Sequence, residues 1–192
     1  MLDTFQRLRY RLPLKPRQVQ IEITNRCNMD CPMCPREDLN IELEHMDWSK
    51  FVTVVDKLNE RENITLTGWG EPFLHPRIFD MITYCKDRGH KVMTTSNGLF
   101  LKETIVEKIL NTDLDELTFS IDGIEDNNVF DGHTSNKVYE NIEKITKLRK
   151  NGKPMIRLQS TLHKGCEKDL YDVIRFGARI GIEAVNVGRI DR

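Results

Sequence analysis

Runs of alternating apolar and polar residues recur between helical segments from residue 19 onward, and this rhythm constrains the fold more than any other feature. The runs predict strands at residues 19–24, 64–68, 91–95, 116–121, 155–161 and 183–188. Apolar residues spaced by three and four predict helices between them, near residues 51–58, 78–85, 102–111, 136–150 and 167–180. Strands and helices that alternate in this way are typical of repeated βα units, and thus of an α/β fold with a parallel sheet.

The strands predict a sheet with one polar face. Leu117, Phe119 and Ile121 alternate with polar residues, and the other strands repeat the pattern. A parallel sheet covered by helices on both faces would be apolar on both sides, and a polar face is costly to bury unless its groups are hydrogen-bonded. We therefore expect a curved sheet with helices outside and a wet, ligand-filled concave side. An open sheet with one solvated face is the alternative.

Residues 19–192 are expected to form one domain, because this part of the chain has no linker and no low-complexity tract. Residues 1–18 are expected to be a basic lead-in segment, which contains one acidic residue, Asp3, and five basic residues. These basic residues are Arg7, Arg9, Arg11, Lys15 and Arg17. The chain stops just after the sixth predicted strand, so either a final helix is missing because the sequence is a fragment or a short barrel ends there.

The net charge of −1 over 192 residues gives no overall reason to expect nucleic acid or an anionic membrane as a partner. The apolar stretches are far shorter than the ~20 residues that a membrane span requires, and the N-terminus lacks the apolar region of a signal peptide. Five cysteines are an odd number, which favours a reducing compartment over a disulfide framework. We therefore expect a cytoplasmic protein, with Cys85 in the core and Cys166 as a partly exposed loop thiol.

Three of the cysteines, Cys27, Cys31 and Cys34, lie within eight residues directly after the first predicted strand. Thiolates in a C-x3-C-x2-C pattern on one short loop can converge on one metal centre. A structural zinc site takes four protein ligands, and His45 is the nearest candidate for the fourth. An iron–sulfur cluster held by three cysteines leaves one iron open to a non-protein ligand. The loop favours the cluster, with a Cys3His zinc site or plain buried thiols as alternatives.

Four short motifs, one after each of the first four predicted strands, together resemble the radical S-adenosylmethionine (SAM) superfamily. In chain order they are the cysteine triplet, Gly68-Trp69-Gly70-Glu71-Pro72, Thr95-Ser96-Asn97-Gly98 and Ser120-Ile121-Asp122-Gly123. The second is similar to the Gly-Gly-Glu-Pro motif of the family, the third to its Thr-Asn-Gly turn and the fourth to its Ser-x-Asp. The match runs over most of residues 19–190. All four motifs lie at the carboxyl ends of strands, where the active sites of barrels collect.

This resemblance implies a partial (β/α)6 barrel, a parallel curved sheet with outer helices, that binds a [4Fe–4S] cluster and SAM. It assigns the cluster to Cys27, Cys31 and Cys34 and places SAM on the fourth iron. The residues implied to contact SAM are Met33, Gly68, Gly70, Glu71, Ser96, Asn97, Ser120 and Asp122. The candidates for substrate contact are polar residues of the concave face, namely Glu22, Thr67, Arg157, Gln159 and Asn186.

The implied reaction starts when the reduced cluster gives one electron to the sulfonium of SAM. The C5′–S bond then breaks, and the 5′-deoxyadenosyl radical abstracts hydrogen from a substrate, which is a peptide or a small molecule. The partners implied are this substrate and a one-electron donor such as flavodoxin or ferredoxin. No nucleic acid or membrane is expected.

The sequence departs from the family pattern in four respects. Trp69 interrupts the Gly-Gly pair, which is a variant of the branch of peptide and cofactor maturases, and Ser96 splits the Thr-Asn pair. Gly165-Cys166 stands where many relatives in that branch have Gly-Asn, and the extra cysteines of their auxiliary clusters are missing. Two other functions are compatible with the sequence. One is a zinc-bound or metal-free α/β domain that binds without catalysis, and the other is an activase that installs a glycyl radical on a partner enzyme.

Overall fold

The computed structural model describes residues 18–36, 38–58, 61–123 and 136–189, so most of the basic lead-in lies outside the described residues. Six strands form one parallel sheet whose order follows the chain. The strands are β1 (Gln18–Ile21), β2 (Asn63–Leu66), β3 (Lys91–Ser96), β4 (Glu116–Ser120), β5 (Met155–Leu162) and β6 (Ala184–Arg189). Because all six run the same way, their carboxyl ends lie along one edge of the sheet. The predicted parallel α/β fold is confirmed.

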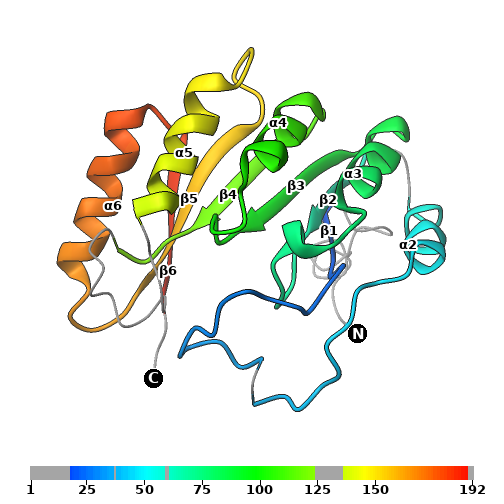
Figure 1. Cartoon of the computed structure of the whole chain (residues 1–192), viewed down its shortest axis with the longest axis horizontal. Helices are drawn as coiled ribbons and strands as arrows, with labels where there is room; N and C mark the ends of the chain where they lie inside the picture. Colours follow the sequence, from blue (N-terminus) through cyan, green and yellow to red (C-terminus); the bar gives the residue numbers. More distant parts are fainter. Residues whose placement is uncertain (1–17, 37, 59–60, 124–135, 190–192) are drawn as a thin grey trace, which may run out of the picture.

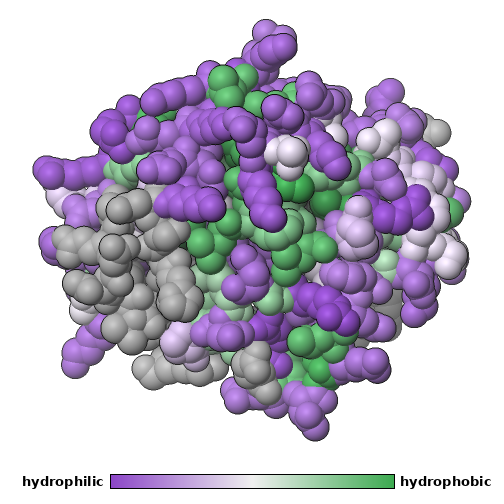
Figure 2. All heavy atoms as spheres, viewed as in Figure 1, coloured by the Kyte–Doolittle hydropathy of each residue, from purple (hydrophilic) through white to green (hydrophobic). Residues whose placement is uncertain are grey.

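A helix lies in each connection between strands and packs on the outer face of the sheet (Figure 1). The helices are α2 (Trp48–Val55), α3 (Ile78–Asp87), α4 (Glu103–Asn111), α5 (Asn136–Leu148) and α6 (Glu167–Ile180), with a short 3-10 helix, η1 (Pro72–Leu74). Their apolar stripes form one core with the sheet, in which Phe51, Met81 and Ile142 join Leu66 and Phe119. The outer faces of the helices stay polar, and Figure 2 shows a largely hydrophilic surface on this side.

Burial alternates along the strands, as the sequence predicts. On β5, Ile156, Leu158 and Ser160 are buried beneath the helices, whereas Arg157 and Gln159 lie on the opposite face and are less buried. The same alternation holds on β2 and β3. The sheet therefore has one apolar face that carries the fold and one polar face that is available for ligands.

Two elements differ in extent from the prediction. β1 ends at Ile21 because its register partner Leu66 is the last residue of β2, although Ile23 is still buried beyond it. Thr24 instead pairs with His45 in an isolated antiparallel bridge. The first helix begins at Trp48 and ends at Val55, about one turn earlier than its apolar spacing predicts. No helix within the described ranges has both the length and the apolar character needed to cross a membrane.

Candidate active site

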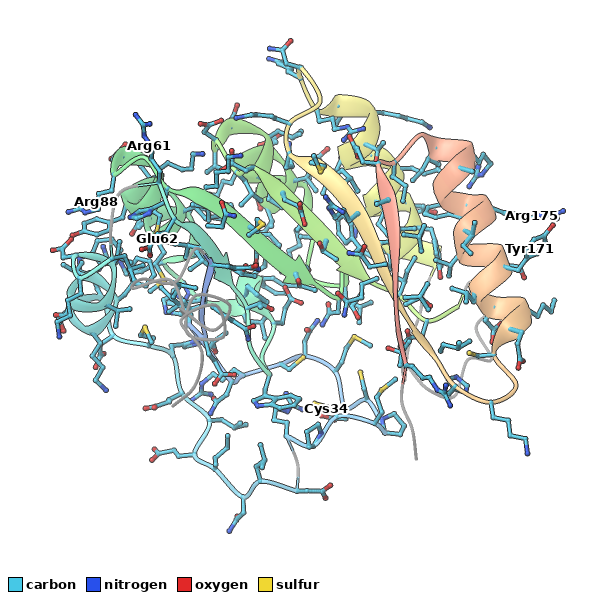
Figure 3. All side chains as sticks on the ribbon, turned by 180° about the vertical axis from the view of Figure 1, so that it is seen from behind. Cys34, Arg61, Glu62, Arg88, Tyr171 and Arg175 are labelled. Atoms are coloured by element: carbon cyan, nitrogen blue, oxygen red, sulfur yellow. The ribbon has the colours of Figure 1, made fainter. Side chains whose placement is uncertain are left out.

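The motif residues occupy four loops at the carboxyl edge of the sheet. The segment after β1 runs past the ends of the neighbouring strands, and it carries Cys34 (Figures 1 and 3). The loops after β2, β3 and β4 begin at the same edge because the strands are parallel and in register. The fold therefore brings together motifs that lie about a hundred residues apart in the sequence.

The cysteine loop offers three thiols. Cys27, Cys31 and Cys34 are each partly exposed, and none of the three forms a disulfide. A turn brings the last two together, since the backbone N–H of Cys34 donates to the carbonyl of Cys31 at 2.9 Å. Among the residues described, no three His, Cys, Asp or Glu side chains are arranged to hold a metal ion. The donor set fits an iron–sulfur cluster in ligand type and access, and the loop must draw the three sulfurs together to bind one.

His45, the candidate for a fourth zinc ligand, lies next to another histidine. Its ring packs edge-on against the ring of His75, with centroids 5.1 Å apart. Burial lowers the pKa of both rings, which favours their neutral forms. His75 is held by Met46, whose carbonyl lies 3.1 Å from Nε2. His45 is thus held by its ring contact with His75 and by its backbone bridge to Thr24.

Asn97 links the turn after β3 to the cysteine loop. Its side-chain Nδ2 donates to Asn28 Oδ1 at 2.9 Å and lies 3.8 Å from Cys27 Sγ as a weak donor. Its Oδ1 accepts from the backbone N–H of Leu99, which fixes the orientation of the amide. Burial raises the pKa of the Cys27 thiol. The sequence located Asn97 through its motif, but its contact with Cys27 could be found only from the structure.

Glu71 joins the loops after β2 and β3. Its carboxyl group is 2% exposed and accepts three hydrogen bonds from the chain itself. Oε1 accepts from the backbone N–H of Phe73 at 3.1 Å and from Ser96 Oγ at 2.9 Å, and Oε2 accepts from the backbone N–H of Asn97 at 2.8 Å. Burial raises the pKa of Glu71 to about 7, against the opposing effect of these hydrogen bonds. Most of the acceptor capacity of this group therefore serves to hold the two loops together.

The two glycines that flank Trp69 leave space that the chain itself fills. A Cβ on Gly70 would lie 2.4 Å from the carbonyl oxygen of Thr24 and 2.6 Å from that of Arg26. A Cβ on Gly68 would meet the carboxylate of Glu22, whose Oε1 also accepts from the backbone N–H of Trp69 at 2.6 Å. The glycines therefore let the loop after β2 press against the start of the cysteine loop.

Replacing Gly70 by alanine is expected to lower the free energy of unfolding by about 1–3 kcal/mol, because the new methyl group meets backbone that cannot rotate away. Gly188→Ala is the control, since its nearest neighbour is the carbonyl of Ser160 at 4.0 Å, and its effect should stay within about 0.5 kcal/mol. Urea unfolding of the apo protein measures both. Equal stability of the two variants would contradict the role given to Gly70.

The remaining motif residues lie around the same edge. Ser120 is exposed at the end of β4, and Met33 is partly buried within the cysteine loop. Asp122 is 6% exposed, and its Oδ1 accepts from the backbone N–H of Thr161 on β5. Burial raises the pKa of Asp122, opposed by its bonds to Thr161. Asp122 thus joins the segment after β4 to β5, while Ser120 is accessible to a ligand.

The substrate candidates fall into two groups. Gln159 and Asn186 are register partners on β5 and β6, and both are exposed on the polar face. Arg157 lies two residues before Gln159 and forms an ion pair with Glu116, whose Oε2 is 2.9 Å from its Nε. On the far side, Glu22 is bound to the loop after β2 and Thr67 donates its backbone N–H to Ile21. The sheet brings Arg157, Gln159 and Asn186 together on β5 and β6, whereas Glu22 and Thr67 lie beyond the ends of β1 and β2.

The structure corrects the prediction for Cys166 and adds one residue, Arg36, that the sequence analysis did not name. Cys166 is 2% exposed, and its Sγ bonds to the carbonyls of His163 and Thr161, so the prediction of an exposed thiol is wrong. Cys85 is buried on α3 as predicted. Arg36 was not singled out in the sequence, although its position two residues after Cys34 in a loop that also contains Asp30 was a usable signal.

Comparison with known proteins identifies the family. The family model of the radical SAM superfamily matches residues 21–176. The chain is 31% identical over 179 residues to the tungsten-containing aldehyde ferredoxin oxidoreductase cofactor-modifying protein of Pyrococcus furiosus. The aligned region covers 88% of this chain and 50% of that protein. It is 27% identical over 157 residues to the GTP 3′,8-cyclase of Chlorobaculum tepidum, with 79% of the chain and 46% of the cyclase covered.

A solved structure confirms the architecture. SuiB of Streptococcus suis bound to S-adenosylmethionine superposes with a TM-score of 0.79 at 15% identity, over 98% of this chain and 44% of that one. The six-stranded curved sheet with outer helices is therefore the partial (β/α)6 barrel that the motifs predict. The chain spans about half the length of the relatives it matches.

Proposed function

The chain belongs to the radical SAM superfamily, and from this membership we propose that it forms the catalytic core of an enzyme that cleaves SAM reductively to start radical chemistry on a polar substrate. Membership implies a [4Fe–4S] cluster and SAM as cofactors. When bound, the reduced cluster supplies the electron that breaks the C5′–S bond of SAM. The observation that carries the proposal is the hydrogen-bonded link from Glu71 through Asn97 to Cys27, which ties three motif loops into one site.

In this proposal the thiolates of Cys27, Cys31 and Cys34 would hold the cluster, and SAM would bind to it through its amino and carboxylate groups. Glu71 attracts the ammonium group through its one remaining acceptor position, and Ser96 or Asn97 meets the carboxylate. Other contacts are assigned by position: Gly68 and Gly70 to the methionine part, Ser120 and Asp122 to the ribose, and Met33 to the adenine.

The substrate is proposed to lie against the polar face of the sheet near Gln159 and Asn186, where amide groups are exposed side by side. Arg157 lies two residues before Gln159, and its ion pair with Glu116 neutralises its positive charge. A polar face without net charge favours a polar substrate of low net charge. The relatives point to a peptide or a small molecule, because SuiB has been solved with a bound precursor peptide, SuiA, and another relative is named for modifying a cofactor.

The proposal also includes the cellular compartment and the electron donor. We propose a reducing compartment such as the cytoplasm, because the five cysteines are odd in number and three of them would serve as thiolate ligands. There a flavodoxin or a ferredoxin would serve as the one-electron donor. Glu22 and Thr67 remain candidates for substrate contact on the β1 side of the sheet.

Anaerobic reconstitution of the wild-type chain with iron and sulfide tests the proposed function. We expect about four irons and four sulfides per chain and a broad visible absorption band. Dithionite and SAM are then expected to yield 5′-deoxyadenosine, measured by chromatography. One zinc per chain, or a reconstituted cluster that leaves SAM intact, would overturn the proposal in favour of a binding domain.

A further inference from the structure

Arg36 is a buried cation inside the cysteine loop. It follows Cys34 by two residues and is 5% exposed. Its Nη2 donates to the carbonyl of Met29 at 2.9 Å and to Asp30 Oδ1 at 2.8 Å. Both acceptors lie between Cys27 and Cys31. The guanidinium therefore spans the loop from its last cysteine back to its middle.

Arg36 forms an ion pair with Asp30 that links a buried cation to an exposed anion. The Asp30 side chain is 84% exposed, so solvent screens much of its attraction, whereas the Arg36 side chain is 4% exposed. A buried guanidinium is costly unless negative charge lies close to it. The two hydrogen bonds of Nη2 to Met29 and Asp30 hold the cation within the segment that carries Cys27, Cys31 and Cys34.

We propose that Arg36 is a positioning residue that holds the cysteine loop in shape and places a fixed positive charge beside the cluster, so that it favours the reduced state of the cluster. This inference rests on the proposed function, since it requires a cluster on Cys27, Cys31 and Cys34. Three thiolates give such a site a negative charge, and reduction adds one more. A cation held at a fixed distance in a poorly solvated loop stabilises the more negative state to a greater extent.

The proposal predicts opposite shifts for the two partners of the ion pair. Arg36→Gln removes the cation and should lower the ratio of reduced to oxidised cluster about tenfold at a fixed potential, which for one electron is 59 mV. Asp30→Asn removes the opposing anion and should shift the ratio the other way by less, because Asp30 is exposed. Arg36→Lys keeps the charge and should keep the ratio within about threefold, while it loses the rigid planar guanidinium whose Nη2 donates to both acceptors.

The control is Arg149→Gln. Arg149 is also a largely buried guanidinium, with a side-chain exposure of 11%, and it bonds to Glu183 and to the carbonyl of Pro154. Those partners precede β6 and β5, so Arg149 lies at the amino edge of the sheet, away from the cysteine loop. Its replacement should leave the potential of the cluster unchanged.

Two measurements test the proposal. The first is the reduction potential of the reconstituted cluster, followed by electron paramagnetic resonance in wild type and variants. The second is backbone hydrogen exchange of residues 27–36 in the apo protein, which should quicken in Arg36→Gln and, to a smaller degree, in Arg36→Lys. If Arg36→Gln reconstitutes too poorly to titrate, the opposite shift in Asp30→Asn and the retained potential in Arg36→Lys decide the matter.

A wild-type potential and wild-type exchange in Arg36→Gln would overturn the inference while leaving the proposed function intact. Shifts of the reduction potential in the same direction in Arg36→Gln and Asp30→Asn would also overturn it. A general loosening of the loop would change the potential in the same way whichever charge is removed. A wild-type chain that holds no cluster would instead refute the proposed function. The two failures are therefore distinguishable.

Discussion

Replacing Cys31 by alanine is expected to abolish the cluster and to reduce the yield of 5′-deoxyadenosine by about a hundredfold or more. Loss of a group that merely orients a metal ligand costs about 10–100-fold in metal affinity or activity, and the loss of a ligand itself should cost more. Cys31 is the central cysteine of the triplet, and its carbonyl also accepts from Cys34 at 2.9 Å. Alanine keeps this backbone bond, so the variant removes the sulfur and little else.

Cys85→Ala is the matched control for this experiment. Cys85 is fully buried on α3, and burial raises the pKa of its thiol to about 12, which keeps it protonated and inert as a ligand. Its replacement should cost about 1 kcal/mol of stability through lost packing and leave the iron content and the product yield at wild-type values. Equal product from Cys31→Ala and wild type would remove the cysteine triplet from the mechanism.

The sequence predicts the sheet well because burial alternates along the strands and turns separate them. Ile156, Leu158 and Ser160 face the helices while Arg157 and Gln159 face away, and this two-residue period is visible in the sequence alone. The end of a strand is less predictable, because it depends on the partner. β1 stops at Ile21 where β2 stops, although the apolar pattern continues further.

The sequence also locates the loops of the site, but it does not specify their contacts. Asn97 and Cys27 are 70 residues apart, and their contact follows from strand order and register rather than from any local pattern. Cys166 shows the same limit: its loop position after Gly165 predicts exposure, but bonds from its own loop bury it. The position of Arg36 in the cysteine loop is visible in the sequence, but its burial is not, because a long charged side chain is normally exposed.

Replacing Glu71 by alanine is expected to lower the free energy of unfolding by about 3 kcal/mol or more and to weaken SAM binding. The change leaves the donors of Phe73, Ser96 and Asn97 without their acceptor in a buried place, and each unsatisfied buried donor costs about 1–3 kcal/mol. Glu71→Gln should lower the free energy of unfolding by less. The side-chain carbonyl oxygen of glutamine can still accept the bonds from Phe73 and Ser96, and only the N–H of Asn97 then faces the NH2 group. Chemical denaturation of the apo variants measures the stability loss, and calorimetric titration with SAM of the reconstituted variants measures the binding loss.

The raised pKa of Glu71 also predicts a pH dependence of stability. The unfolded chain loses this proton near pH 4.5, whereas the folded chain keeps it until about pH 7. Between these values the folded state binds more protons, so the free energy of unfolding falls as pH rises through the window and then levels off. A shift of this size corresponds to about 3 kcal/mol. Wild type should therefore lose more stability than Glu71→Gln between pH 5 and pH 8.

Glu103→Gln provides the control for the pH profile. Glu103 is exposed, and its hydrogen bond to Lys144 lowers the pKa of its carboxyl group, so it contributes with the opposite sign and its removal cannot abolish the fall. If the profiles of wild type and Glu71→Gln run parallel from pH 5 to pH 8, the carboxyl of Glu71 is ionised throughout. The cationic end of SAM would then meet a permanent anion, and SAM affinity would not rise with pH. If the profiles diverge as expected, the ammonium group of SAM must compete with a proton for Glu71, and SAM binding should strengthen between pH 6 and pH 8.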